Sequence, residues 1–179
     1  MNNPAVKEHH KGSNGPYNFA IITISSSRFE KHGSVASPHE ADDSSGQVME
    51  TLILRSGHRI SHYRLVDDDP ESIAGAVLDA VGSKADIVIT SGGTGLTSRD
   101  VTIESVVPMF SKQMQGFGEL FRYKSIDQIG TSVILTRASA GVISGKAVFC
   151  LPGSPAAVEL AIGGIIIPEA GHIMKHVRE

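Results

Sequence analysis

The stretch of residues 86–104 constrains this chain most, because it joins an apolar run directly to a cluster of glycines and hydroxyl side chains. The run at residues 87–89 is Ile-Val-Ile, and unbroken β-branched residues are typical of a strand buried on both faces of a parallel sheet. Gly92, Gly93 and Gly95 follow at once. Glycines let backbone N–H groups approach an anion closely. The stretch therefore predicts a phosphate-binding loop at the end of a central strand.

The same stretch ends in hydroxyl and carboxylate side chains. Asp100 and Glu104 are four residues apart, so a helix beginning near Arg99 would place both on one face, where their oxygens could hold a divalent cation. Commoner glycine motifs fit less well. The dinucleotide fingerprint needs a third glycine where Ser98 stands, and residues 141–146 are one residue too short for a Walker loop. A connection without any ligand is the remaining alternative, and the flanking strand and carboxylates weigh against it.

Composition restricts the class of protein. The 179 residues, with 40% hydrophobic and 20% charged residues, suit one soluble domain, expected over residues 17–179 after a disordered tail at residues 1–16. The net charge of −3 and the absence of a basic block argue against nucleic-acid binding. The apolar stretch at 162–167 contains glycines and is shorter than the roughly 20 residues of a membrane span. Cys150 is the only cysteine, so we expect a cytoplasmic protein without internal disulfides, with Cys150 in the core.

Strand-like and helix-like segments alternate along the chain. This order predicts an α/β fold, a three-layer α/β/α sandwich with a mainly parallel central sheet and a small edge hairpin or insertion. Pro70 suits the first turn of its helix, and Ser154 is a suitable N-cap. The segment at 129–137 has no clear place on the sheet. The expected strands are 19–24, 58–66, 87–89 and 146–151, and the expected helices are 45–54, 70–80, 119–124 and one or two within 154–177.

Ligands of such sheets bind beyond the carboxyl ends of the strands. Those ends are followed here by residues 25–28, 67–69, 91–100 and 151–155, so four loops are expected to converge on one cleft. The helix that starts after Ser154 adds backbone donors there, although a plain structural cap explains that serine equally well. Asp68 also has a second, structural interpretation, in which its carboxylate interacts with the N-terminal end of the following helix.

Three blocks together resemble the signature of the MoaB/MogA molybdopterin-binding family of molybdenum cofactor biosynthesis. They lie at residues 91–102, 116–119 and 151–155, and the resemblance extends over about residues 19–167. The region around 123–142 is closer to the MoaB branch than to MogA. The resemblance implies a molybdopterin-binding fold, assembled as a homotrimer or homohexamer, in which molybdopterin is adenylylated by ATP with Mg²⁺.

Carried over to this sequence, the family's functional aspartates correspond to Asp68 and Asp100, which would be catalytic and would hold Mg²⁺. Residues 43–46 resemble an Asp-x-Ser-Gly element of the family through Asp43, Ser45 and Gly46. Two departures, Ser26 and Asp67, leave the register of 67–69 open by one residue. The residues expected to bind substrate or nucleotide are Ser25, Ser26, Ser91, Gly92, Gly93, Thr94, Gly95, Thr97, Pro152, Gly153 and Ser154.

Two other functions compete with this interpretation. One is a molybdopterin-binding or carrier protein without catalysis, because some MoaB members are thought to lack adenylyltransferase activity. The other is an unrelated nucleotide-binding or interaction domain. In the enzyme, the substrate's own phosphate would attack the α-phosphorus of ATP, so that no serine or cysteine nucleophile is needed.

Two histidine pairs are spaced four residues apart. His58 and His62 lie in an expected strand, where this spacing puts them on the same face but gives no ready chelate. His172 and His176 lie near the end of an expected helix, where imidazolium suits the helix dipole. A structural role is favoured over a metal site for both pairs.

Overall fold

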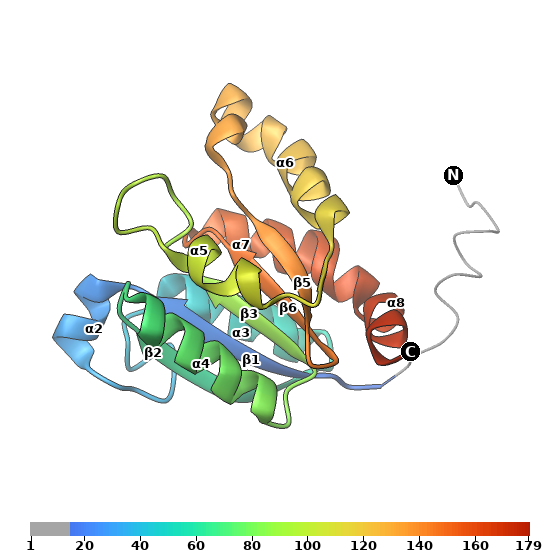
Figure 1. Ribbon diagram of the computed structural model, residues 1–179, viewed down its shortest axis with the longest axis horizontal. Coiled ribbons are helices and arrows are strands. Elements are labelled where there is room, and N and C mark those ends of the chain that lie inside the picture. Colours follow the sequence, from blue (N-terminus) through green and yellow to red (C-terminus); the bar gives the residue numbers. More distant parts are fainter. Residues whose placement is uncertain (1–14) are drawn as a thin grey trace.

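The computed structural model describes residues 15–179, so most of the tail expected at residues 1–16 lies outside the described residues. A six-stranded, mostly parallel sheet occupies the centre, in the order β2-β1-β3-β6-β5-β4 (Figure 1). The predicted α/β class is confirmed. The strands are β1 (Asn18–Ile24), β2 (Arg59–Val66), β3 (Ile87–Ser91) and β6 (Lys146–Leu151), which are parallel, and β5 (Ser139–Ile143) and β4 (Lys112–Gln113), which continue the sheet antiparallel.

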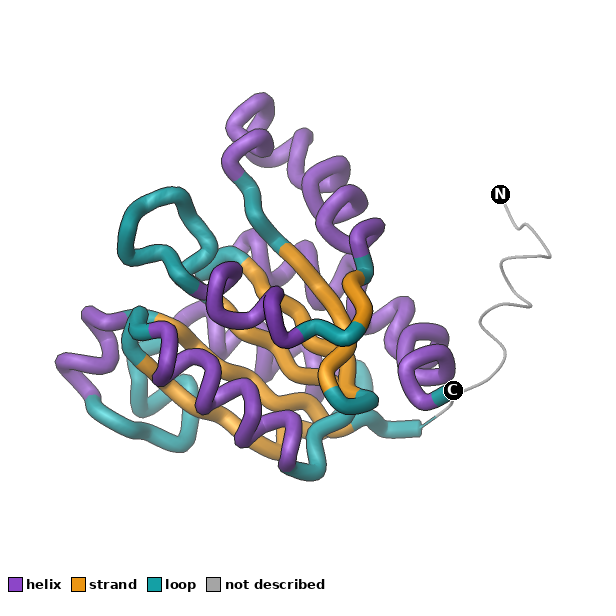
Figure 2. Tube along the Cα trace, in the orientation of Figure 1, coloured by secondary structure: helices purple, strands orange, loops and turns teal. Residues whose placement is uncertain are grey.

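Helices cover both faces of the sheet, as Figure 2 shows. They bury two separate apolar clusters, one on each face. Alternate residues of β1 enter opposite clusters, because successive strand side chains point to opposite faces: Phe19 and Ile21 join one, and Ala20 and Ile22 the other. One face carries α3 (Ser44–Arg55), α6 (Gln115–Ile129), α7 (Pro155–Ala161) and α8 (Ile167–Arg178), and the other carries α4 (Pro70–Gly82) and α5 (Thr102–Val106).

Several elements differ from the sequence prediction. The polar stretch after β1 contains a short helix, α2 (Ser26–His32), which buries no residue and therefore has no apolar periodicity to read. The helix expected near Arg99 is α5, and it begins only at Thr102. Most of the unplaced segment at 129–137 is a 3₁₀ helix, η2 (Gly130–Leu135), while η1 (Val107–Met109) precedes the edge strand β4.

The last helical stretch runs from Pro155 to Arg178, with a π-helical turn, η3 (Ile162–Ile166), between α7 and α8. By length and composition alone it is long and apolar enough to cross a membrane, which the short stretch at 162–167 did not suggest. Its buried positions, however, lie three and four residues apart. They include Val158, Ile162, Ile166, Ala170 and Met174, and they pack in the core on one face of the sheet. The stretch therefore covers the sheet as an amphipathic core helix does.

Candidate active site

The loops after β1 and β2 are tied together by Asp68 and Ser26. The backbone N–H and the hydroxyl of Ser26 both donate to Asp68 Oδ2, each at 2.8 Å. The Asp68 N–H in turn donates to Ser26 Oγ at 3.0 Å. Its neighbour Asp69 has a different role, because its carboxylate caps α4 by accepting from the Ser72 N–H at 2.9 Å. The capping function considered for Asp68 thus belongs to Asp69, and Asp68 is left to face the next loop.

That next loop is the glycine-rich turn after β3. Gly92 and Gly93 have φ angles of +107° and +61°, which favour glycine. A Cβ atom on Gly93 would lie 3.1 Å from Asp68 Oδ1 and would overlap Thr102 Oγ1. The Thr102 hydroxyl donates to the Gly92 carbonyl at 2.8 Å and so fixes the turn. The backbone at Gly93 is therefore held directly against the free side of the Asp68 carboxylate.

Asp100 also lies against the glycine-rich turn, but beside Gly95, two residues after the Gly93 that contacts Asp68. Both the N–H and the hydroxyl of Thr97 donate to Asp100 Oδ2, at 2.9 Å and 2.5 Å. A Cβ atom on Gly95 would come within 2.7 Å of that oxygen. The hydroxyl of Thr97 is the main reason that the pKa of Asp100 is lowered, with smaller contributions from backbone N–H groups and Arg137. Asp68 and Asp100 thus flank one glycine loop, and Asp100 is ionised at neutral pH.

Arg137, which no sequence motif indicated, holds this loop from the side of the sheet edge. Its guanidinium donates from Nε to the Thr94 carbonyl at 3.0 Å and from Nη2 to the Asp100 carbonyl at 3.3 Å. It also forms an ion pair with Glu104 at 2.5 Å, and its hydrogen bond lowers the pKa of Glu104. The helix face expected to carry both Asp100 and Glu104 does not form, because α5 begins only at Thr102 and Glu104 is paired with Arg137.

The loop after β6 closes the site. A Cβ atom on Gly153 would lie 3.2 Å from the Gly92 Cα, so these two loops are in close contact. The hydroxyl of Ser45 donates to the Gly153 carbonyl at 2.7 Å and fixes its position. All four loops expected to converge do so. A cavity of about 380 Å³ lies between the glycine loop, residues 135–137 and the loop after β6, and the loops after β1 and β2 do not line it. Its lining residues are Gly92, Gly93, Thr94, Gly95, Asp100, Leu135, Thr136, Arg137, Pro152, Gly153 and Ser154.

Other residues selected from the sequence support the loops instead of lining this cavity. Ser25 caps α2, with its hydroxyl accepting from the Arg28 N–H at 3.4 Å. Ser91 is buried, and among the described residues its hydroxyl has no hydrogen-bond partner. Ser154 does line the cavity, but its hydroxyl already caps α7 by accepting from the Ala157 N–H at 3.2 Å. Asp100 and Arg137 are the charged residues that line the cavity, beside the glycines and the apolar Leu135 and Pro152.

Asp43 lies in the core beneath the site. Its carboxyl is 1% exposed and accepts hydrogen bonds from the Thr23 hydroxyl at 2.7 Å and the Tyr63 hydroxyl at 3.1 Å. Gly46 lies so close that a Cβ atom there would overlap Asp43 Oδ2. The Asp-x-Ser-Gly element is thus a structural support, in which Asp43 anchors the start of α3 and Ser45 reaches the Gly153 loop.

The donor set fits a magnesium ion bound together with substrate. Within residues 15–179 no group of three or more His, Cys, Asp or Glu side chains is placed to hold a metal ion alone. Mg²⁺ usually keeps several waters and binds through one or two carboxylates plus substrate phosphates. Asp68 and Asp100, on either side of a glycine loop, provide such a pair of carboxylates.

Three of the four paired histidines contact other protein groups, whereas His62 Nε2 is buried and has no hydrogen-bond partner among the described residues. The His58 Nδ1 accepts from the Tyr17 N–H at 3.2 Å, and burial lowers the pKa of His58. His172 and His176 hydrogen-bond to each other through Nε2 at 3.0 Å. The interpretation of His58 as structural agrees with its contacts.

Comparison with known proteins identifies the family. Residues 20–172 match the model of a probable molybdopterin binding domain. The chain belongs to this family. Molybdenum cofactor biosynthesis protein B of Bacillus cereus is 44% identical over 171 residues, covering 94% of this chain and 95% of that protein. A Pyrococcus furiosus protein named molybdopterin adenylyltransferase is 40% identical over 178 residues, covering 97% of this chain and 99% of that protein.

A solved structure supports the same assignment. The crystal structure of a molybdenum cofactor biosynthesis protein B superposes with a TM-score of 0.82 at 43% identity, covering 91% of this chain and 96% of that chain. The family inferred from the three sequence blocks is therefore confirmed, and so is the predicted fold.

Proposed function

We propose that this protein acts in molybdenum cofactor biosynthesis by binding molybdopterin and transferring to it the adenylyl group of ATP, with release of pyrophosphate. The observation that carries the proposal is the placement of Asp68 and Asp100 against the same glycine loop, beside a cavity at the carboxyl edge of the sheet. Similarity to the adenylyltransferase of Pyrococcus furiosus over nearly the whole chain supports it.

The chemistry requires no nucleophile from the protein. An oxygen of the molybdopterin phosphate forms a bond to the α-phosphorus of ATP, while the bond between that phosphorus and the bridging oxygen of pyrophosphate breaks. This suits a cavity in which the Ser154 hydroxyl serves as a helix cap. Cys150 lies in the core, and burial raises the pKa of its thiol to about 12. Catalysis then rests on positioning and on stabilisation of charge on the phosphate oxygens.

Residues in and beside the cavity have different roles: some bind phosphate, some fix the loop, and some would hold the metal ion. The backbone N–H of Gly92 donates to the Leu151 carbonyl at 3.0 Å and that of Gly95 to the Asp100 carboxylate, which leaves the N–H groups of Gly93 and Thr94 for phosphate oxygens. Arg137 fixes the loop through the Thr94 carbonyl. Asp68 and Asp100 would hold Mg²⁺, which would supply positive charge to the phosphates of ATP. Ser26 keeps Asp68 oriented by two hydrogen bonds to one oxygen.

We also propose that the protein is cytoplasmic and assembles as a homotrimer or homohexamer. Large apolar side chains are exposed along α6 and η2, and exposed apolar side chains in such number are typical of a surface that contacts another subunit. Sedimentation analysis would show the assembly as a mass three or six times that of the 18.9 kDa chain. The exposed side chains are Leu120, Tyr123, Ile126, Ile129, Ile134 and Leu135.

The decisive experiment measures pyrophosphate release from ATP and Mg²⁺ with and without molybdopterin, in parallel with direct binding of molybdopterin. Release that depends on molybdopterin is the expected result. Binding of molybdopterin without pyrophosphate release would instead identify a carrier protein. Absence of both binding and release would point to an unrelated binding domain.

A further inference from the structure

Two imidazole rings face each other on the solvent-accessible side of α8, one helical turn apart. The buried positions Ala170 and Met174 turn the opposite side of the helix toward the sheet, and the side chains of His172 and His176 are 32% and 61% exposed. Their Nε2 atoms lie 3.0 Å apart, with the ring centroids 4.8 Å apart. The spacing in the sequence alone favours a structural role, and this orientation of the rings is what the sequence does not show.

The other nitrogen of each ring lies beside a carboxylate. Nδ1 of His172 is 3.4 Å from Glu169 Oε2, and Nδ1 of His176 is 3.6 Å from Glu179 Oε2. A carboxylate only accepts hydrogen bonds, so it favours the tautomer in which the ring proton is on Nδ1. Both Nε2 atoms then carry a lone pair, and the two lone pairs face each other across 3.0 Å. A cation between the two nitrogens removes their repulsion.

A transition-metal ion fits between these nitrogens. Bonds from zinc to histidine nitrogen are about 2.0–2.1 Å long, so two bonds to atoms 3.0 Å apart enclose an angle of roughly 90–97° at the ion. This angle suits octahedral coordination, and a small rotation of one ring reaches the tetrahedral value of about 109°. A carboxylate on the far nitrogen of a ligating imidazole is the usual arrangement around bound metals. Histidines four residues apart on one helix face also form the zinc-binding part of the H-E-x-x-H motif.

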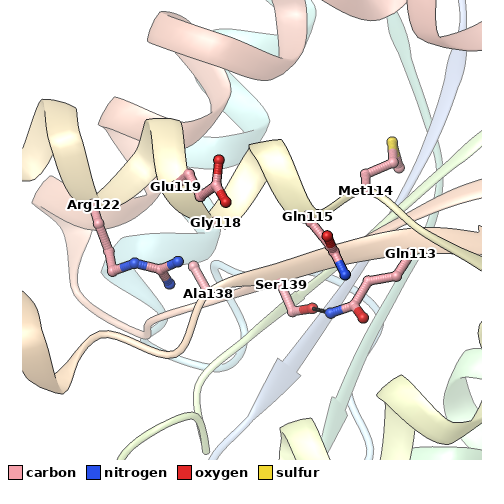
Figure 3. Close-up of a pocket in the computed structure, with 8 residues that line it drawn as sticks. All are labelled: Gln113, Met114, Gln115, Gly118, Glu119, Arg122, Ala138 and Ser139. Carbon is pink, nitrogen blue, oxygen red and sulfur yellow. Dashed lines mark hydrogen bonds between the residues drawn. The ribbon is translucent and has the colours of Figure 1, made fainter.

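The two rings line a cavity of about 440 Å³ between α8 and the edge strands β4 and β5. The other residues that line it are Lys112, Gln113, Met114, Val142, Ile173 and Val177. Gln113 is already engaged there, because its side-chain amide donates to Ser139 Oγ at 3.3 Å (Figure 3). A protonated lysine has no lone pair for a metal. The imidazoles are therefore the nitrogen ligands of this cavity, which leaves space for water at the remaining coordination positions.

The ligand set selects the kind of metal. Imidazole nitrogens suit Zn²⁺, Cu²⁺ and Ni²⁺, whereas Mg²⁺ prefers oxygen ligands such as those of Asp68 and Asp100. Ile173 stands where the H-E-x-x-H motif has the glutamate that acts as general base, so the pair has no hydrolytic machinery. With two protein ligands the ion is exchangeable, unlike a structural zinc held by four.

We propose that His172 and His176 bind one divalent transition-metal ion through their Nε2 atoms, and that this ion clips together successive turns of α8. The same end of the helix carries Arg178, which donates to Asp86 Oδ1 at 2.6 Å beside the start of β3. A bound ion holds these turns helical and so reinforces the contact between α8 and the sheet. The site is independent of the proposed adenylyl transfer, because it shares no residue with the glycine loop.

Isothermal titration calorimetry of the untagged, full-length protein with zinc chloride tests the site. The wild type is expected to bind one Zn²⁺ whose affinity falls at least tenfold in His172→Gln and in His176→Gln. His176→Cys supplies a thiolate, which is also a zinc ligand, and should retain binding. His39→Gln is the matched control, because His39 is 67% exposed and lies 3.0 Å from a carboxylate oxygen of Glu50. This control should bind Zn²⁺ as the wild type does.

Two further measurements separate this site from other imidazoles. His9 and His10 are adjacent in the sequence, so the titration is repeated with both changed to glutamine, and the affinity should stay within twofold. Zn²⁺ should raise the melting temperature of the wild type and leave that of His172→Gln and His176→Gln unchanged, because an ion that binds only the folded protein stabilises it.

Three outcomes would overturn the proposal. They are a wild type that binds no Zn²⁺, unchanged affinity in both His172→Gln and His176→Gln, and an equal loss in His39→Gln or in the variant that lacks His9 and His10. Circular dichroism identifies a variant that has failed to fold, and the other glutamine variant then carries the test. Pyrophosphate release should be the same in His176→Gln as in the wild type, so failure of the metal site and failure of the proposed catalysis are distinguishable.

Discussion

Substitution of Gly93 by alanine tests whether the loop backbone must approach Asp68 as closely as the structure shows. A residue other than glycine at a φ of +61° costs about 1–2 kcal/mol. The new methyl group would also overlap Thr102 Oγ1, which must move and lose its hydrogen bond to the Gly92 carbonyl, at a further cost of about 0.5–1.5 kcal/mol. We expect the free energy of unfolding to fall by about 2–3 kcal/mol.

For a domain of this size such a loss lowers the melting temperature by roughly 4–12 °C, which calorimetry measures directly. Gly75→Ala is the matched control, because Gly75 lies inside α4 with open space around its Cβ position. There the change should raise stability by about 0.5–1 kcal/mol. A Gly93→Ala protein as stable as the wild type, or the same loss at both positions, would refute the close packing described here.

Three further predictions concern side chains in and below the site. Tyr63→Phe removes a buried hydrogen bond to Asp43 and should lower the free energy of unfolding in urea by about 1 kcal/mol, whereas no change would mean that this bond contributes nothing. The lowered pKa of Asp100 means that its contribution to stability is present above its ordinary value of 3.8 and is lost as pH falls below it. Thr97→Val should raise this pKa, as followed by NMR titration, and an unchanged pKa would contradict the role given to the Thr97 hydroxyl. Cys150, whose pKa is raised to about 12 by burial, should resist iodoacetamide in the native protein at pH 8 and react in urea, and rapid reaction without urea would contradict its placement in the core.

The fold could be predicted where the sequence has strong periodicity or strong local signals. The β-branched run of β3 and the apolar spacing of α4 identify buried elements without reference to the rest of the chain. Pro70 correctly marks the start of α4. By contrast, α2 buries nothing, and β5 is built from Ser-Ala-Gly-Val-Ile, which lacks the apolar run expected of a strand. Such elements form because of their neighbours, and single-sequence patterns do not contain that information.

In the candidate site, too, residues with a strong local signal could be predicted and those that depend on long-range contacts could not. The glycine loop and Asp100 stand out because glycine and carboxylate are the residue types that phosphate and Mg²⁺ require, whereas Asp68 is indicated only by the resemblance to the MoaB/MogA family. The choice between Asp68 and Asp69 depends on which one caps α4, and this only the folded geometry decides. Arg137 lies 43 residues from Thr94 in the chain, and no local motif links the two. Long-range contacts of this kind complete the cavity that the sequence could only outline.

The most direct test of the central claim is molybdopterin-dependent pyrophosphate release by Asp68→Asn and Asp100→Asn proteins, with molybdopterin binding measured on the same samples. If the two carboxylates act together on the phosphates at the glycine loop, each variant should lose at least a hundredfold in rate while keeping its pterin affinity within a few-fold. Near wild-type release by either variant would contradict the assignment of these two residues to the reaction.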